Sequence, residues 1–187
     1  MPTAGWGSRK AVTRWRDLQN AGTQPTYVLT MEVSAEPKAV AIALADPDTP
    51  QKLHPLIVGA EVLEHEVDDD GSSTAVIDFT DQVKICGCIP WTVKYRAYLV
   101  GMIDGLPDDG DTKCPTVLAC ASVSGTNVVH HYQCIASKKA GVTIVRDAVY
   151  IEAPAPVRSY VEKTARVSHV ESLAKLPALF DDSINAD

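Results

Sequence analysis

Residues 89–103 have the sequence IPWTVKYRAYLVGMI, and their pattern decides the fold class of the chain. Apolar and aromatic side chains occupy alternate positions through the middle of this run: Trp91, Val93, Tyr95, Ala97 and Leu99. Most of the positions between them are polar or charged. Because successive side chains of a β-strand point to opposite faces of its sheet, this alternation predicts a long strand with one face on the core.

Similar strand-like runs flank this segment on both sides. They are residues 27–33, 60–67, 73–83, 116–123, 127–136 and 142–151, all rich in strand-forming residues. Short turn sequences separate most of them, including Asp68–Gly71 and Ser124-Gly125. Seven strands joined in this way predict an antiparallel meander, and a strongly twisted sheet of that size curls.

Three helices complete the predicted fold. Residues 36–45 and 49–54 predict two short helices, separated by the break Asp46-Pro47-Asp48. A long helix is expected from Val157 to Leu176, with prolines before and after it. One stripe of this helix carries small or apolar residues: Val157, Val161, Ala165, Ser168, Ser172 and Leu176.

This stripe must be buried, and the concave face of the curled sheet is the available surface. Its small residues leave space between helix and sheet, which predicts an apolar pocket there. The fold class is therefore α+β: a seven-stranded curved antiparallel sheet, two short helices and a long C-terminal helix. We expect residues 25–180 to form this domain, with a basic extension at 1–24 and a flexible tail at 181–187.

Composition narrows the partners and the compartment. The 187 residues carry a net charge of −7, and residues 1–24 hold four basic residues against one acid, so the domain is more acidic still. An acidic domain repels a phosphate backbone, which argues against nucleic acid as a partner. An odd number of cysteines and no secretory leader favour the cytoplasm. The basic extension allows two interpretations, a segment packed on the surface or an organelle-targeting peptide.

The chain resembles a known superfamily in two segments. Residues 45–55, ADPDTPQKLHP, are similar to the segment between the short helices in the polyketide cyclase/dehydrase branch of the START-like, helix-grip (SRPBCC) superfamily. Residues 164–176, TARVSHVESLAKL, are similar to its last helix, and the element order matches over residues 26–180. Leu53 departs from the pattern, because that branch often has an aromatic residue there.

The resemblance implies a pocket for a hydrophobic or amphipathic small molecule, but it does not imply one reaction. Members include lipid carriers, hormone and metabolite binders, cyclases and ATPase co-chaperones. We expect a carrier or sensor of a lipid-, sterol- or polyketide-like ligand. The alternatives are a cyclase or dehydratase acting in the same pocket and a protein-interaction module. Transient membrane contact is consistent with a lipid carrier, and the sequence leaves the oligomeric state open.

Candidate ligand-binding residues come from the strands and the last helix. They are Trp91, Tyr95, Arg146, Val161, Ala165, Ser168, His169 and Ser172. Trp91 and Tyr95 combine an apolar body with a polar group. Arg146 needs an anion if its face is inward, either a ligand carboxylate or an acid such as Asp78. The alternative for Arg146 is exposure to solvent.

Histidines are the candidates for acid–base catalysis. His54 ends the second short helix near the expected pocket mouth, and with Tyr95 it is the best candidate catalytic pair. A capping or packing role is the alternative for His54. His130 and His131 are adjacent on a strand, so they face opposite sides, and either could point into the pocket. We expect one half-buried and one exposed histidine. His169 lies beside the apolar stripe, as a pocket residue or a core residue.

No metal ion or other cofactor is expected. Cys86 and Cys88 have no second cysteine pair at a spacing typical of zinc sites, and they are interpreted as small packing residues. The sequence also lacks a glycine-rich phosphate loop, a serine nucleophile elbow and the zinc-protease HExxH motif.

Overall fold

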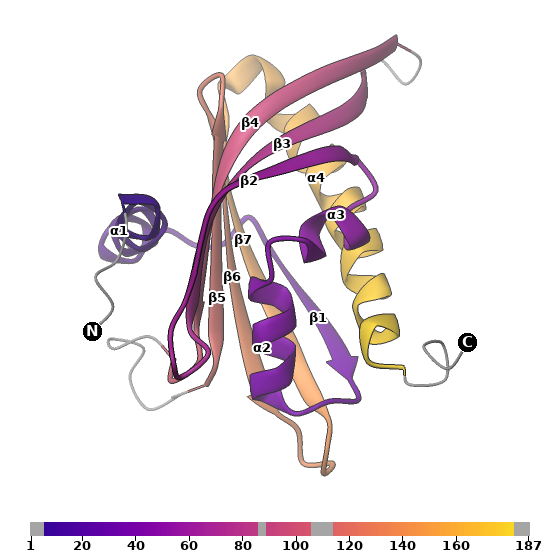
Figure 1. Cartoon of the computed structure of the whole chain (residues 1–187). Helices are drawn as coiled ribbons and strands as arrows, with labels where there is room; N and C mark the ends of the chain where they lie inside the picture. The colour runs from indigo at the N-terminus through magenta and orange to yellow at the C-terminus, as the bar shows by residue number, and fades with distance from the viewer. Residues whose placement is uncertain (1–5, 86–88, 106–113, 182–187) are drawn as a thin grey trace.

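The computed structural model describes residues 6–85, 89–105 and 114–181 (Figure 1). The helices are α1 (Trp6–Asn20), α2 (Pro37–Ala45), α3 (Thr49–Leu53), α4 (Ala155–Lys175) and the 3-10 helix η1 (Leu176–Phe180). The strands are β1 (Tyr27–Val33), β2 (Ile57–Val67), β3 (Ser73–Ile85), β4 (Ile89–Met102), β5 (Thr116–Val123), β6 (Thr126–Ala136) and β7 (Thr143–Glu152). Cys86 and Cys88 lie outside the described residues.

All seven strands form one antiparallel sheet, in the order β1-β7-β6-β5-β4-β3-β2. Strands β2 to β7 form the predicted meander, and β1 pairs with β7 at the far edge. Ser124 and Gly125 have positive φ angles of 49° and 78°, as a two-residue hairpin between β5 and β6 requires. The predicted α+β fold, with its seven-stranded antiparallel sheet, two short helices and long C-terminal helix, is confirmed.

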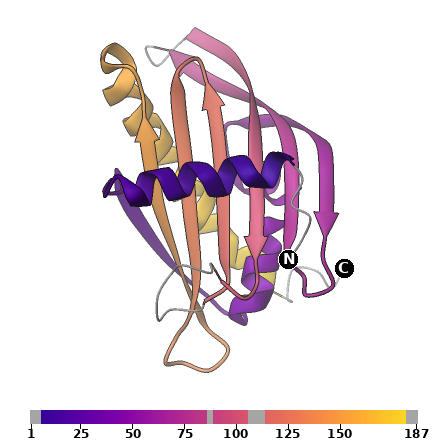
Figure 2. The same cartoon turned by 90° about the vertical axis from the view of Figure 1, so that its left-hand side faces the viewer.

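The sheet curves around α4, and α1 lies across its opposite, convex face (Figures 1 and 2). Adjacent residues therefore enter different cores: Leu99 of β4 packs in the concave core, and Val100 packs against α1. Val117 and Leu118 of β5 divide in the same way. Both faces of the central strands are buried.

Helix α2 packs closely on β4 because a glycine faces it. A Cβ atom at Gly101 would lie 2.6 Å from the Cβ of Ala45 in α2, well inside van der Waals contact. Only a residue without a side chain lets the two elements approach this far. Together with α3, α2 closes the lower part of the concave face (Figure 1).

Helix α1 forms a second apolar core on the convex face. Its buried side chains are Ala11, Trp15 and Leu18, and they pack with residues such as Val129 and Tyr150. Trp15 also covers His131, with ring centroids 5.1 Å apart, and His131 is 5% exposed. The expectation that one of the two adjacent histidines faces solvent is therefore wrong, because α1 covers that face.

Within the described residues, no helix is long and apolar enough to cross a membrane.

Candidate functional site

A cavity of about 350 Å³ lies between the concave face of the sheet and α4, at the position predicted from the small residues of that helix. Helix α3 and the segment after it close one side. Most of the wall is apolar, and the residues contributed by β3 to β6 include Ile77, Phe79, Val83, Val93, Ala97, Leu99, Ala119, Ala121, Val123 and Val128. Most of the titratable lining residues gather in two groups.

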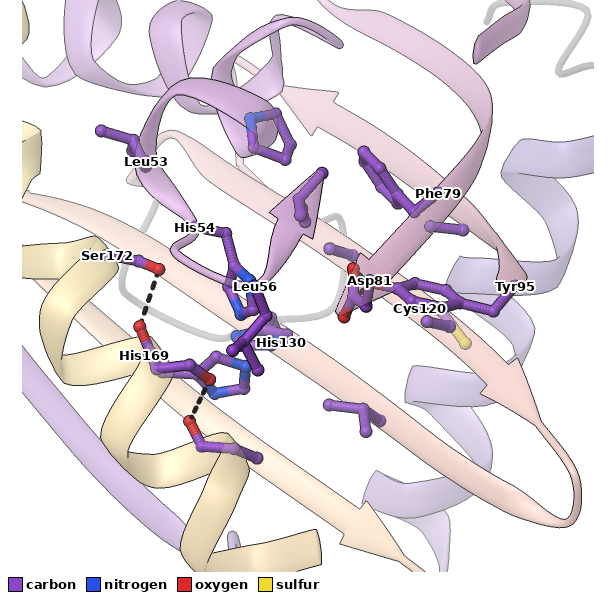
Figure 3. Close-up of a pocket in the computed structure, with 18 of the residues that line it drawn as sticks. Leu53, His54, Leu56, Phe79, Asp81, Tyr95, Cys120, His130, His169 and Ser172 are labelled. Atoms are coloured by element: carbon purple, nitrogen blue, oxygen red, sulfur yellow. Dashed lines mark hydrogen bonds between the residues drawn. The ribbon is translucent and has the colours of Figure 1, made fainter. Parts of the chain in front are cut away.

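Three histidines from distant parts of the chain form the first group, which we call the histidine cluster: His54, His130 and His169. His54 follows α3, His130 lies on β6 and His169 lies on α4 (Figure 3). The ring centroids of His130 and His169 are 4.3 Å apart in an edge-on contact, and those of His54 and His169 are 5.6 Å apart.

Two of these histidines have hydrogen-bond partners from the sheet. Nδ1 of His130 lies 3.1 and 3.0 Å from the two carboxylate oxygens of Asp147 on β7. Nδ1 of His169 lies 2.6 Å from the phenolic oxygen of Tyr27 on β1. Nδ1 of His54 is buried and makes no hydrogen bond within the described part of the chain. The hydrogen-bonding capacity of this nitrogen is therefore unsatisfied within the described residues.

Burial keeps two members of the histidine cluster neutral. Burial, with smaller effects of His130 and Lys175, lowers the pKa of His54 to about 4. Burial, together with the neighbouring His130 and His54, holds the pKa of His169 well below its ordinary value. A neutral imidazole can both donate and accept a hydrogen bond. Across the described residues, no three His, Cys, Asp or Glu side chains are arranged to hold a metal ion.

Asp81 and Tyr95 form the second polar group. The hydroxyl of Tyr95 donates to the Asp81 carboxylate and lies 3.1 Å from each of its oxygens. Asp81 is 9% exposed, and its burial raises the pKa of the carboxyl to about 6, partly offset by the bond from Tyr95. Burial and the adjacent Asp81 raise the pKa of Tyr95, so its hydroxyl keeps its proton.

Most of the residues predicted from sequence do line the cavity. They are His54, Tyr95, Val161, Ala165, Ser168, His169 and Ser172. The two serines offer little to a ligand, because their hydroxyls donate to carbonyl oxygens of their own helix. Figure 3 shows the bond of Ser172. The two serines contribute space between the helix and the sheet, as predicted from their size.

Two predicted residues lie outside the cavity lining. Trp91 is 57% exposed, towards the tip of the β3–β4 hairpin. Arg146 points away from the cavity, since its neighbour Asp147 points into it, and its guanidinium donates to Oε1 of Gln133 at 2.9 Å. The expectation that Arg146 faces the pocket is therefore wrong. Asp78, the acid suggested as its partner, instead bonds Arg96 on the surface, at 2.7 and 2.8 Å.

Three important residues were not predicted: Tyr27, Asp81 and Asp147. The sequence allows His130 to face the pocket, but His130 was not among the predicted ligand-binding residues. The sequence does contain a signal for Asp147. It is a lone acid between Val145 and Val149 on one face of a buried strand. An acid in such a place needs a partner. Its partner His130 stands diagonally opposite, since the register pairs Tyr132 with Asp147, and register is not readable from sequence.

Comparison with known proteins agrees with this architecture. No protein-family model matches the sequence, and no curated protein matches it. Solved structures do match. The Zhui aromatase/cyclase from Streptomyces sp. R1128 is 13% identical, with a TM-score of 0.57, covering 86% of this chain and 95% of its own.

Two further structures give the same result. A protein from Thermus thermophilus is 13% identical with a TM-score of 0.55, covering 80% of this chain and 92% of its own. A STAR-related lipid transfer protein from Xanthomonas axonopodis is 13% identical with a TM-score of 0.51, covering 79% and 82%. The chain therefore has the START-like, helix-grip fold. At this level of identity the likeness concerns the fold alone, so function has to be argued from the site.

Proposed function

We propose that this protein binds a hydrophobic or amphipathic small molecule in the cavity between the sheet and α4, as a carrier or sensor. The observation that carries the proposal is the cavity itself, whose volume of about 350 Å³ falls in the range of small-molecule sites. Its wall is mainly apolar, and burial of apolar ligand surface contributes about 25 cal/mol per Å². The two polar groups would orient the ligand.

The names of the similar structures are consistent with this class of ligand. One is a lipid transfer protein and another is an aromatase/cyclase. A lipid has a large apolar part, which would match the mainly apolar wall of this cavity. The proposal for this chain rests on its own cavity, and the names only agree with it.

Native mass spectrometry of gently purified protein, with displacement of a neutral apolar fluorophore, tests the binding proposal. We expect a copurifying or added apolar molecule bound at one per chain. Ala165→Phe places a ring in the cavity and should lower affinity more than tenfold. Val167→Phe is the matched control, because Val167 lies on the same helix but is 54% exposed and outside the lining. Absence of any bound apolar molecule would refute the proposal.

A second candidate function is acid–base catalysis of the cyclase or dehydratase type on a similar ligand. It is favoured by the pairing of His130 with Asp147 beside two further histidines in a largely apolar cavity. A carboxylate partner fixes the tautomer and the orientation of an imidazole, which suits a general base. Of the pair predicted from sequence, His54 lines the cavity and has no hydrogen bond at Nδ1 within the described residues. The hydroxyl of Tyr95 is engaged with Asp81.

Turnover of a poly-β-ketone thioester analogue by the purified protein tests the second candidate. His130→Gln and His54→Ala should each lower the rate by about 10² to 10⁴ if these groups transfer protons. His65→Gln is the control, since His65 lies on the exposed part of β2. Unchanged turnover in both cavity variants would rule out the proposed catalytic histidines without affecting the binding proposal.

A further inference from the structure

Acidic side chains line the cavity, with no lysine or arginine among the described lining residues. The two carboxylates are those of Asp81 and Asp147. Asp147 is engaged with His130. Lys175 influences the histidine cluster from outside the lining. The described wall therefore offers no lysine or arginine to receive an anionic ligand.

Asp81 keeps unused acceptor capacity. A carboxylate offers about four lone-pair positions. Within the described part of the chain, the Asp81 carboxylate accepts from the Tyr95 hydroxyl alone, and this single proton is shared between both oxygens at 3.1 Å. The carboxylate lies within the cavity beside Tyr95 and Phe79 (Figure 3), where it is 9% exposed.

A buried carboxylate in this position has a definite preference among ligands. Bringing a second anion into an apolar cavity beside it costs desolvation of the new charge and adds repulsion between like charges. A donor group instead supplies a proton to the unused oxygen lone pairs. For a cationic donor, attraction to the carboxylate also offsets the cost of its desolvation. The raised pKa of the Asp81 carboxyl, about 6, is caused mainly by burial that no positive partner offsets.

We infer that Asp81 anchors a hydrogen-bond-donating group of the ligand, a hydroxyl or a protonated amine, and that the cavity rejects ligands bearing a carboxylate or phosphate. This inference rests on the proposed binding function and specifies its ligand class. Tyr95 acts as a positioning residue, since its hydroxyl holds the Asp81 carboxylate in one orientation. The apolar wall beyond Asp81 receives the body of the ligand.

Three matched ten-carbon compounds test the inference on the full chain at pH 8: 1-decanol, decylamine and decanoic acid. Each is titrated against protein loaded with the neutral fluorophore N-phenyl-1-naphthylamine. We expect the alcohol and the amine to displace the probe at concentrations at least tenfold lower than decanoate. Equal or tighter binding of decanoate would overturn the inference and leave the proposed function intact. Failure of the probe and all three compounds to bind would refute both.

Variants test whether Asp81 itself causes the preference for donor ligands over anionic ones. Asp81→Asn should weaken decylamine at least tenfold, strengthen decanoate, and change decanol less, because the amide oxygen still accepts from a hydroxyl. Asp78→Asn is the matched control on the same strand, and its side chain bonds Arg96 outside this cavity, so all three affinities should stay unchanged. If Asp81→Asn leaves the three affinities as in the parent protein, Asp81 is not the anchor. The parent series tests the charge preference even if this variant fails to fold.

Discussion

The phenolic oxygen of Tyr27 lies 2.6 Å from Nδ1 of His169, across 142 residues of sequence. Tyr27 begins β1, at the edge of the sheet, and His169 lies on α4. The bond therefore joins the first strand to the last helix beside the cavity. It also orients the imidazole that contacts both other members of the histidine cluster.

Tyr27→Phe should lower the free energy of unfolding by about 1–2 kcal/mol, because it leaves a buried imidazole nitrogen without its partner. Equilibrium unfolding in urea measures the change. Tyr98→Phe is the control, since the Tyr98 hydroxyl accepts a bond from the exposed Lys10. We expect a change below about 0.5 kcal/mol for the control. Equal losses in both variants would contradict a special role for the Tyr27 bond.

His54 should make the protein sensitive to acid. Its pKa in the folded state is about 4, below the ordinary 6.5, so the unfolded state takes up a proton first as the pH falls. The contribution of the neutral His54 imidazole to the free energy of unfolding is fully present above pH 6.5. It is lost as the pH falls towards 4. At about 1.4 kcal/mol per pH unit, the upper limit of this loss is roughly 3 kcal/mol.

Melting temperatures of His54→Gln and the parent protein at about pH 7.5, 5.5 and 4.5 measure this contribution. The variant should lose less stability on acidification, because glutamine does not titrate. His65→Gln, at an exposed position on β2, should follow the parent protein at all three pH values. Parallel curves for His54→Gln and the parent would contradict the prediction.

Asp81 should have the opposite dependence on pH. Its folded pKa of about 6 lies above the ordinary 3.8, so the folded state holds the proton more tightly. Stability therefore falls as the pH rises from about 4 to 6, and the full cost of the buried carboxylate is present above that range. Asp81→Asn removes this cost and should raise the free energy of unfolding at pH 8 by up to roughly 3 kcal/mol.

Urea unfolding at about pH 8 and pH 3 tests the sign of the change that Asp81→Asn causes in the free energy of unfolding. The stabilisation expected at the higher pH should nearly disappear at the lower, where the parent carboxyl is largely protonated in both the folded and the unfolded state. Destabilisation at the higher pH would show that the Tyr95 bond outweighs the burial of the charge. A buried carboxylate that lowers the stability of the fold but keeps unused hydrogen-bond acceptor positions is typical of a functional site.

Gly101→Ala should destabilise the protein by about 1–3 kcal/mol, the usual cost of forcing an extra group into a packed contact. The new Cβ would meet the Cβ of Ala45 at 2.6 Å, and α2 would have to move away from β4. Gly59→Ala is the matched control in the same sheet, because its nearest contact is the Cβ of Thr80 at 3.7 Å. Thermal unfolding of both variants distinguishes a steric effect from a general cost of replacing glycine.

Local patterns were sufficient to predict the sheet, the two short helices and the long C-terminal helix. The alternation through residues 91–99 predicted a strand, and the prolines around residues 155–176 predicted the two ends of the last helix. Small residues at Ala165, Ser168 and Ser172 located the cavity. Each of these features depends on spacing along the chain, which the backbone geometry of strands and helices converts directly into faces.

The site required contacts that spacing along the chain does not encode. In β7, apolar side chains occupy both faces because α1 buries the convex side, so the pattern could not tell that Asp147 faces the cavity and Arg146 faces away. The pairing of His130 with Asp147 depends on the register between β6 and β7. Sequence alone determined the sheet, the gripping helix and the space between them. The tertiary structure decided which polar groups enter that space, because strand register and the covering of the second face are set by packing between distant segments.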